Sequence, residues 1–353
     1  MGVEMGFFSP GLYSELLARM ELSVEEVPAL FSAANRSASA IDRARKMICS
    51  YVDQHPKHIR DIDDIVAFGS LARYELTPNS DLDYLTISEN PESSEIPDAI
   101  INNIRRTMVT GSELKKPGTT GIFGKSINPK ELISNIGLQR DTNEILTRRV
   151  LFLEESVSLM YPEKHRDILW SIVNTYLDAR ERKGQTPRYL LNDIIRYWRT
   201  IAIDYQAKIE GNKPKALRHV KLLIPRKLCF ISSLAPLYLH HLDVEKFDSE
   251  PNFLVDSYLE PSSIRLMRLL TKSGTNNSLQ QRIVKTLDFF IEKSSDAMWR
   301  KNIEEDIFSN QFNHSPSGPY WEIRERSRQL HKDLTELLFS DNYRSFTEKY
   351  MVI

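Results

Sequence analysis

Residues 62–88 read IDDIVAFGSLARYELTPNSDLDYLTIS. The apolar run at 65–68 predicts one strand, and the aromatic and β-branched residues within 80–87 predict a second. Asp81 and Asp83 are two residues apart, so they point to the same face of a strand. Two adjacent carboxylates repel each other, so they do not stabilise an apolar strand. A divalent cation such as Mg²⁺ changes this, because it binds a few carboxylate oxygens together with water and substrate phosphates.

The residues between these two strands favour phosphate binding. The first strand ends in Gly69-Ser70 and runs into an expected helix start over 71–76, which would leave backbone N–H groups free for an anion. Gly69 allows the backbone to approach a ligand closely, and the Ser70 hydroxyl can donate to a phosphate oxygen. A phosphate-binding turn followed by metal-binding carboxylates suits nucleotidyl transfer, in which a triphosphate is positioned for in-line attack between metal ions.

Three short motifs in this stretch resemble the signature of the polymerase-β-type nucleotidyltransferase superfamily: Gly69-Ser70, Arg73 and Ser80-Asp81-Leu82-Asp83. Residues 69–84 are similar to the bacterial branch that includes the PII-protein uridylyltransferases and their uncharacterised relatives, and a looser likeness extends through 146–156. The resemblance implies an NTP substrate, ATP or UTP, bound by Gly69, Ser70, Arg73 and Ser80. It also implies Mg²⁺ or Mn²⁺ at Asp81 and Asp83.

The superfamily usually adds a third carboxylate on a later strand, and this chain departs from that pattern. The expected third strand spans 119–126, and no acidic residue occurs between Leu114 and Lys130. The next acids, Glu131, Asp141 and Glu144, lie in sequence with a helical pattern. Three alternatives stay open: a third acid from elsewhere in the chain, a site that works with two, or a chain that binds nucleotide without turning it over.

Length and composition indicate a globular protein with more than one domain. The chain has 353 residues, which is long for a single domain, with 41% hydrophobic and 27% charged residues. Its 47 Lys and Arg nearly balance its 48 Asp and Glu. Affinity for a polyanion must therefore come from a local patch rather than from net charge.

The sequence predicts a cytoplasmic location without zinc or membrane partners. Its two cysteines, Cys49 and Cys229, form no metal-binding motif, which fits a reducing compartment. No uninterrupted apolar run approaches the ~18 residues of a membrane span. The oligomeric state stays open at this stage.

The predicted fold class is an α+β nucleotidyltransferase domain, a small mixed sheet with flanking helices, followed by an all-α helical-bundle domain. We expect N-terminal helices over 1–60 that pack on the catalytic domain, the nucleotidyltransferase domain over 61–158 and the helical domain over 159–353. Low glycine content and apolar residues at i, i+4 spacing support the bundle. Its candidate helices are 163–183, 187–210, 214–223, 226–243, 251–272, 278–300 and 320–350.

A basic segment lies in this second half. Residues 179–227 contain 13 Lys or Arg and 4 Asp or Glu. The expected helix 187–210 places Arg196 on a polar face, where Asp193 could pair with it at i+3. We expect Arg196 and Lys221 to form a basic wall of the cleft that neutralises a triphosphate or an RNA acceptor. A solvated charged helix face is the alternative.

Two other polar clusters carry weaker expectations. Asp61, Asp63 and Asp64 precede the first strand, and we interpret them as a solvated strand entry rather than as metal ligands. Arg148 and Arg149 interrupt the apolar stripe of a predicted helix. Because a buried unpaired charge is costly, they are expected to pair with Asp or Glu rather than to contact phosphates.

These observations predict a Mg²⁺-dependent nucleotidyltransferase that moves a nucleoside monophosphate from an NTP to an acceptor hydroxyl and releases pyrophosphate. A protein acceptor is suggested by the likeness to the uridylyltransferases, and an RNA acceptor, such as a tRNA end, by the basic segment. A small-molecule acceptor is the third choice. The non-enzymatic alternative is a nucleotide-binding regulatory or antitoxin-like interaction module, which predicts nucleotide binding without pyrophosphate release.

Overall fold

A small mixed sheet forms the centre of the first half of the molecule. The computed structural model describes residues 9–55, 62–92, 98–109, 113–116, 122–134, 136–137, 139–209, 215–243, 249–309 and 317–351. Within these residues the sheet has four strands in the order β3-β2-β1-β4. The strands are β1 (Asp64–Phe68), β2 (Asp83–Ile87), β3 (Lys125–Ile127) and β4 (Ser156–Ser158). The central β1 is antiparallel to both neighbours, whereas β2 and β3 are parallel.

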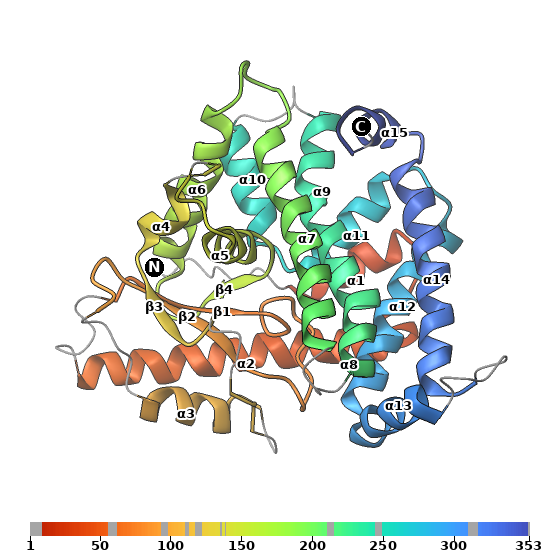
Figure 1. Cartoon of the computed structure of the whole chain (residues 1–353), viewed down its shortest axis with the longest axis horizontal. Coiled ribbons are helices and arrows are strands. Elements are labelled where there is room, and N and C mark those ends of the chain that lie inside the picture. The colour runs from red at the N-terminus through yellow and green to blue at the C-terminus, as the bar shows by residue number, and fades with distance from the viewer. Residues whose placement is uncertain are drawn as a thin grey trace.

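The sheet is covered by helices on both faces (Figure 1). On one side run α2 (Pro28–Gln54) and α3 (Asp98–Thr107), and on the other lie α5 (Asn143–Glu154) and α6 (Pro162–Asp178). Arg45 ties α2 to the sheet, since its guanidinium donates to the Ser158 carbonyl at 3.1 and 3.0 Å. Every residue of β1 is buried, as its apolar sequence predicts for a central strand covered on both faces.

The second half is helical, as predicted. After α6 come α7 (Arg188–Ile209), α8 (Lys215–Lys221), the π-helical turn η2 (Leu222–Arg226) and α9 (Lys227–Asp243). Then follow α10 (Glu250–Leu259), α11 (Ser262–Lys272), α12 (Asn277–Ser295), α13 (Ala297–Ser309), α14 (Pro319–Leu338), α15 (Arg344–Phe346) and the π-helical turn η4 (Thr347–Met351). Shorter elements elsewhere are α1 (Pro10–Ala18), η1 (Val24–Glu26) and α4 (Pro129–Ile133).

Several predicted helices differ from the structure at identifiable residues. The segment 251–272 is two helices, because Pro261 cannot continue the hydrogen-bonding pattern of α10. The segment 278–300 divides at Asp296, which has an extended backbone and caps α13 by accepting from Met298 N at 2.8 Å. The helix start expected over 71–76 is absent, and the chain there forms consecutive turns with Tyr74 at a φ of 61°.

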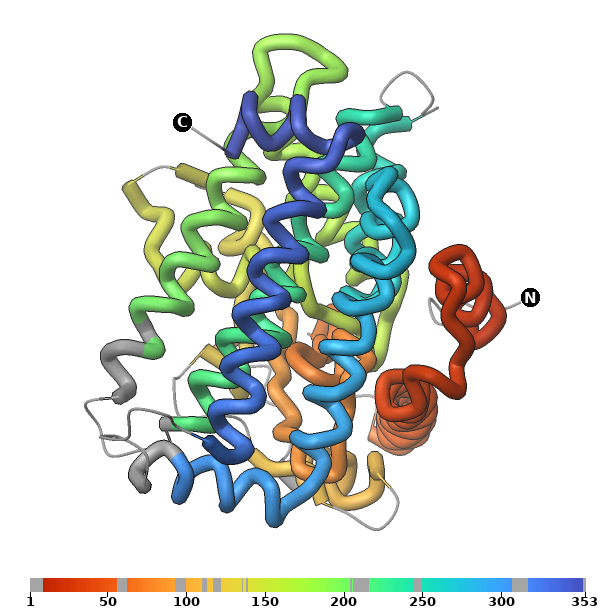
Figure 2. The backbone as a smooth tube through the Cα atoms, turned by 90° about the vertical axis from the view of Figure 1, so that its right-hand side faces the viewer, coloured from red at the N-terminus to blue at the C-terminus, as the bar shows by residue number. Residues whose placement is uncertain are grey.

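The two halves share one hydrophobic core. A single cluster of buried residues extends from Tyr13 in α1 to Phe346 in α15. The N-terminal helices contact both halves, since Leu30 N donates to Asp288 Oδ1 of α12 at 2.8 Å. Figure 2 shows α12 and α14 side by side, with the N-terminal helices on one flank of the molecule. The predicted domain boundaries at 60 and 158 stay a prediction.

One helical stretch is long and apolar enough to span a membrane. It covers Ala216–Asp243 and has a mean hydropathy of 1.4. It was not expected from a search for uninterrupted apolar runs, because Arg218, Lys221 and Arg226 interrupt it. In the fold 72% of its most apolar window is buried, so it acts here as a core helix.

Asp64, one of the three acids interpreted as a solvated strand entry, is not solvated. Asp64 is fully buried, and its Oδ1 accepts from Ile65 N at 2.8 Å, Ser158 Oγ at 2.9 Å and Tyr161 N at 3.0 Å. Burial raises the pKa of Asp64 to about 7. Asp63 does pair near the surface, with Lys164 Nζ at 2.7 Å, whereas Asp61 lies outside the described residues.

Candidate functional site

A polar cavity of about 130 Å³ lies between the sheet and the helical half. One wall comes from the stretch that joins β1 to β2 and includes Gly69, Ser70, Arg73, Ser80, Asp81 and Asp83. The opposite wall comes from the helical half and includes Lys221, Arg226 and Arg300. We call this space the polar cavity. Seven of the eight site residues predicted from the sequence therefore line this cavity.

The turn after β1 is built around Gly69. Its φ is +70°, in the left-handed region that favours glycine, and a Cβ there would lie 3.5 Å from Asp83 Oδ2. The chain then reverses through two backbone hydrogen bonds, from Arg73 N to the Gly69 carbonyl at 2.9 Å and from Glu75 N to the Ser70 carbonyl at 2.8 Å. A phosphate in the cavity would thus meet a tight turn rather than the start of a helix.

Strand alternation directs Asp81 and Asp83 toward the cavity. Leu82 between them is buried in the core, so its two neighbours point to the opposite side. Asp81 is held by a parallel bridge to Lys115, in which Leu82 N donates to the Lys115 carbonyl at 2.9 Å and Lys115 N donates to the Ser80 carbonyl at 3.0 Å. Both carboxylates are partly exposed and line the polar cavity.

These two carboxylates suit a hard divalent cation. Oxygen ligands from one or two carboxylates, completed by water and substrate phosphates, are the usual environment of Mg²⁺ in phosphoryl-transfer sites. Among the described residues there is no group of three or more His, Cys, Asp or Glu that could hold a metal alone. Asp81 and Asp83 therefore fit an ion that binds together with its nucleotide better than one bound by the protein alone.

Comparison with known protein families identifies one segment of the chain. Residues 48–181 match the protein family described as Nucleotidyltransferase domain. This segment is a nucleotidyltransferase domain of the polymerase-β type. The matched segment contains all four strands and continues through α6, past the predicted boundary at 158. No match was found among curated proteins. The match supports a nucleotidyl transfer activity and an NTP substrate, and it confirms the superfamily but not the closer likeness to the PII-protein uridylyltransferases.

The later acids do not supply a third carboxylate to the nucleotidyltransferase site. Asp141 forms a bidentate pair with the buried Arg149, at 3.0 and 2.8 Å. Glu144 is bound by Arg148 at 2.5 Å, and the Glu131 carboxylate lies 3.9 Å from the same guanidinium. The expectation that Arg148 and Arg149 pair with acids is confirmed. Asp193 is a further partner of Arg149, at 3.0 Å.

An aromatic residue, Phe123, precedes the strand that pairs with β2. The parallel register pairs Leu85 with Lys125, so Phe123, just before β3, lies level with Asp83. The Phe123 ring packs against Phe68 with centroids 5.4 Å apart. The described part of the expected third strand, from residue 122 onward, therefore provides no carboxylate. The strand expected over 119–126 is described only from 122 onward, and its regular part is Lys125–Ile127.

Glu75 is the other acid in the wall of the polar cavity, and it belongs to a buried charge network. Arg73 Nε donates to Glu75 at 2.9 Å, and Arg73 Nη1 donates to Glu155. Burial is the main influence on Glu75 and raises its pKa, although Arg73 opposes the shift. Arg73, which the sequence predicted as a nucleotide-binding residue, therefore lies in the cavity wall with its charge already matched by two carboxylates.

Lys221 and Arg300 face the nucleotidyltransferase site, and neither forms an ion pair at contact distance within the described residues. The Lys221 side chain makes no hydrogen bond within the described part of the chain, and the Arg300 guanidinium donates there only to the Asn79 carbonyl, at 3.4 Å. Desolvation lowers the pKa of Lys221 and of Arg300, and the Asp81 carboxylate opposes both shifts. Arg300 had no signal in the sequence, because it lies more than 200 residues beyond the motif.

Arg196, the eighth predicted residue, does not line the polar cavity. It pairs with Asp193 at 3.0 Å, three residues earlier on α7. The helix that carries it instead contributes Tyr197 and Tyr205 to a second cavity.

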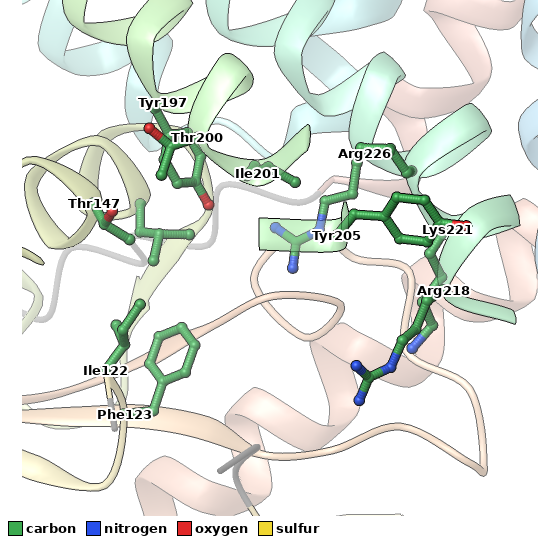
Figure 3. Close-up of a pocket in the computed structure, with 12 residues that line it drawn as sticks. Ile122, Phe123, Thr147, Tyr197, Thr200, Ile201, Tyr205, Arg218, Lys221 and Arg226 are labelled. Carbon is green, nitrogen blue, oxygen red and sulfur yellow. The ribbon is translucent and has the colours of Figure 1, made fainter. Parts of the chain in front are cut away.

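This second, aromatic cavity has a volume of about 380 Å³ and shares Lys221 and Arg226 with the polar cavity. Figure 3 shows Ile122 and Phe123 on one side, and Arg218 and Lys221 on the other. No Asp or Glu is among its lining residues within the described chain. Arg218 Nη1 is buried and has no hydrogen-bond partner among the described residues. An anionic ligand would satisfy this group.

Proposed function

We propose that this chain transfers a nucleoside monophosphate from an NTP, ATP or UTP, to an acceptor hydroxyl and releases pyrophosphate. The observation that carries the proposal is the meeting of Asp81 and Asp83 with the cationic side chains of Lys221 and Arg300 in one cavity beside the Gly69-Ser70 turn. The acidic side would hold Mg²⁺ or Mn²⁺, and the basic side would hold phosphate oxygens.

Each wall residue has a role in this chemistry. Gly69 and Ser70 receive the β- and γ-phosphates, through backbone N–H groups and the Ser70 hydroxyl. Asp81 and Asp83 would hold the metal ion, which would supply electrostatic stabilisation of the phosphoryl oxygens. Lys221 and Arg300 offset the charge that develops on pyrophosphate as the bond between the α- and β-phosphates breaks.

The nucleoside of the donor is assigned to the aromatic cavity. A space of about 130 Å³ suits phosphates but is too small for a whole nucleotide, whereas the adjoining 380 Å³ lies within the usual range for small-ligand sites. Phe123 and Tyr197 offer rings against which a base can pack. Lys221 and Arg226 line both spaces and would contact the phosphates where the two meet.

Labelled nucleotides test the proposal. We expect transfer of label from an α-labelled NTP with Mg²⁺ or Mn²⁺ to a component of a host extract, with loss of at least about 1,000-fold in rate for Asp81→Ala or Asp83→Ala, as for removal of a principal electrostatic group. Asp42→Ala is the matched control, because Asp42 is exposed and, among the described residues, its side chain pairs only with Lys46. Full activity in both site variants would contradict the assignment.

The acceptor is proposed to be a protein or an RNA such as a tRNA end, in the cytoplasm. An RNA acceptor would bind through the basic segment 179–227, so its affinity would fall steeply as salt increases. A protein acceptor would retain the label after ribonuclease treatment. These two outcomes separate the acceptor classes in the same labelling experiment.

A regulatory module is the second candidate function. It is favoured by one observation, the aromatic residue Phe123 level with Asp83 where a third carboxylate is expected. This candidate predicts that the chain binds an NTP with Mg²⁺ but releases no pyrophosphate with any extract. Measured pyrophosphate release would exclude it.

A further inference from the structure

Glu155 is a buried carboxylate at which three parts of the fold meet. It follows the last residue of α5 and precedes β4. Its Oε2 accepts from Arg73 of the phosphate-binding turn, and its Oε1 accepts from Arg226 of η2 at 2.8 Å. Burial alone would raise the pKa of Glu155, but Arg226 and Arg73 hold that pKa below its ordinary value, so the group is ionised at neutral pH.

Arg226 depends on Glu155 more than Arg73 does. Arg73 keeps a second carboxylate, Glu75, at 2.9 Å. The Arg226 side chain makes no other hydrogen bond within the described residues, and about a third of it is exposed. A guanidinium has five N–H donors, and only Nη1 of Arg226 is used by Glu155. The other donors are available to a ligand in the two cavities that Arg226 lines (Figure 3).

We propose that Glu155 is a positioning residue that holds Arg226 where the polar and aromatic cavities meet, so that its remaining N–H groups bind the phosphates of the NTP. This inference rests on the proposed function. The Glu155 charge itself opposes an anionic ligand, so its benefit lies in fixing a long side chain before the ligand arrives, which reduces the ordering cost of binding. Glu155 touches neither cavity and acts only through Arg226.

A double-mutant cycle tests this role, because it isolates the coupling between two residues. The measurement is the Kd of ATP and of UTP with Mg²⁺, by equilibrium dialysis, for the full chain. We expect Glu155→Gln to raise the Kd about tenfold in the wild-type background. This factor corresponds to the cost of ordering one long side chain, here Arg226, when the ligand binds. In the Arg226→Gln background the same change is expected to have less than a twofold effect.

A purely structural role for Glu155 predicts the opposite pattern, since loss of the buried carboxylate would weaken binding by the same factor in both backgrounds. Equal factors, or unchanged affinity in Glu155→Gln alone, would overturn the inference. Glu260→Gln is the matched control. Glu260 pairs with Arg268 at a distance of 2.6 Å, and this ion pair lies outside both cavities. It is expected to leave the Kd unchanged.

Glu155→Asp keeps the inference testable if the glutamine variant does not fold. It retains the negative charge between Arg73 and Arg226 but shortens the side chain, so Arg226 is drawn back from the cavities. A loss of affinity that disappears in the Arg226→Gln background supports positioning, and an equal loss in both overturns it. A wild-type chain that binds no NTP would overturn the proposed function itself. A wild-type chain that binds NTP, combined with equal losses in both backgrounds, would overturn only the positioning role of Glu155.

Discussion

Asp64 lies at the first position of β1 with its carboxyl group sealed from solvent. Its Oδ1 accepts several hydrogen bonds, whereas its Oδ2 has no partner among the described residues, which suits a protonated acid. With a folded-state pKa of about 7 against an ordinary value of 3.8, the folded protein retains a proton that the unfolded chain loses. The free energy of unfolding therefore falls as pH rises from about 4 to 7.

Asp64→Asn should remove this pH dependence. The amide keeps the accepting oxygen and cannot ionise, so the variant is expected to match the wild type near pH 4 and to be more stable above pH 7, by on the order of a few kcal/mol. Urea unfolding at pH 5 and pH 8 measures the difference. Parallel pH profiles for the two proteins would show that Asp64 is ionised in the folded state.

At the scale of single residues, the sequence predicts roles where the chemistry is local. The pairing of Arg148 and Arg149 follows from the cost of burying charge, and both pair with acids. Arg300 and Glu155 could not be predicted, because their roles come from contacts between segments far apart in the chain. Asp64 was misinterpreted because a polar run before a strand gives no sign of which face will be buried.

At the scale of elements, the π-helical turn η2 affects how two basic side chains face the cavities. Pro225 lacks an N–H, and its ring would clash with the carbonyl of Lys221 in a regular α-helix. The wider π-turn relieves this clash. In an α-helix with 3.6 residues per turn, Lys221 and Arg226 would be separated by about 140° around the axis. A turn with i→i+5 bonds brings such residues close to one face, and both line the two cavities.

Pro225→Ala tests the role of this turn. Alanine permits a regular helix, which would rotate Arg226 away from Lys221, so we expect the Kd of ATP or UTP to rise about five- to tenfold while thermal stability is maintained or improved. Pro236→Ala in the same helical run is the control, because Pro236 lies outside both cavities. Equal nucleotide affinity in the two variants would show that the turn has no role in binding.

The strands also show where sequence patterns stop being informative. The apolar run and the β-branched residues locate β1 and β2 correctly, because the pattern is local. The position and direction of β3 depend on pairing with β2, and only that register places Phe123 level with Asp83. The helix expected over 71–76 fails because hydrogen bonds within the turn, to Gly69 and Ser70, replace the helical pattern.

At the scale of the whole molecule, the two halves are joined by polar contacts as well as by their shared core. Arg265 of α11 donates to the Glu154 carbonyl at the end of α5. Asn79, in the turn before Asp81, donates to the Ser295 carbonyl at 3.2 Å. Gln281 of α12 donates to the Met20 carbonyl at 2.9 Å. The nucleotidyltransferase domain is therefore held by partners from both ends of the chain.

We expect the chain to unfold in one cooperative transition. Residues 1–181, which include the family match, would leave their contacts with α11 and α12 exposed and should not fold alone. Far-UV and near-UV circular dichroism should give coincident melting curves for the full chain. Two separated transitions, or a folded 1–181 fragment, would show that the halves are independent.

Phe123, level with Asp83 in the strand register, occupies a position without a carboxylate, which has a consequence for the choice of acceptor. Within the described residues, the polar cavity offers no further acid to take a proton from an attacking hydroxyl if the two aspartates hold a metal ion as proposed, because Glu75 is bound to Arg73. Reactivity must then follow the acidity of the hydroxyl itself. A tyrosine hydroxyl, with a pKa of about 10, should react faster than the hydroxyl of a serine or of a sugar. Among acceptors that fit the site equally well, the one whose hydroxyl group loses its proton most readily would thus react fastest.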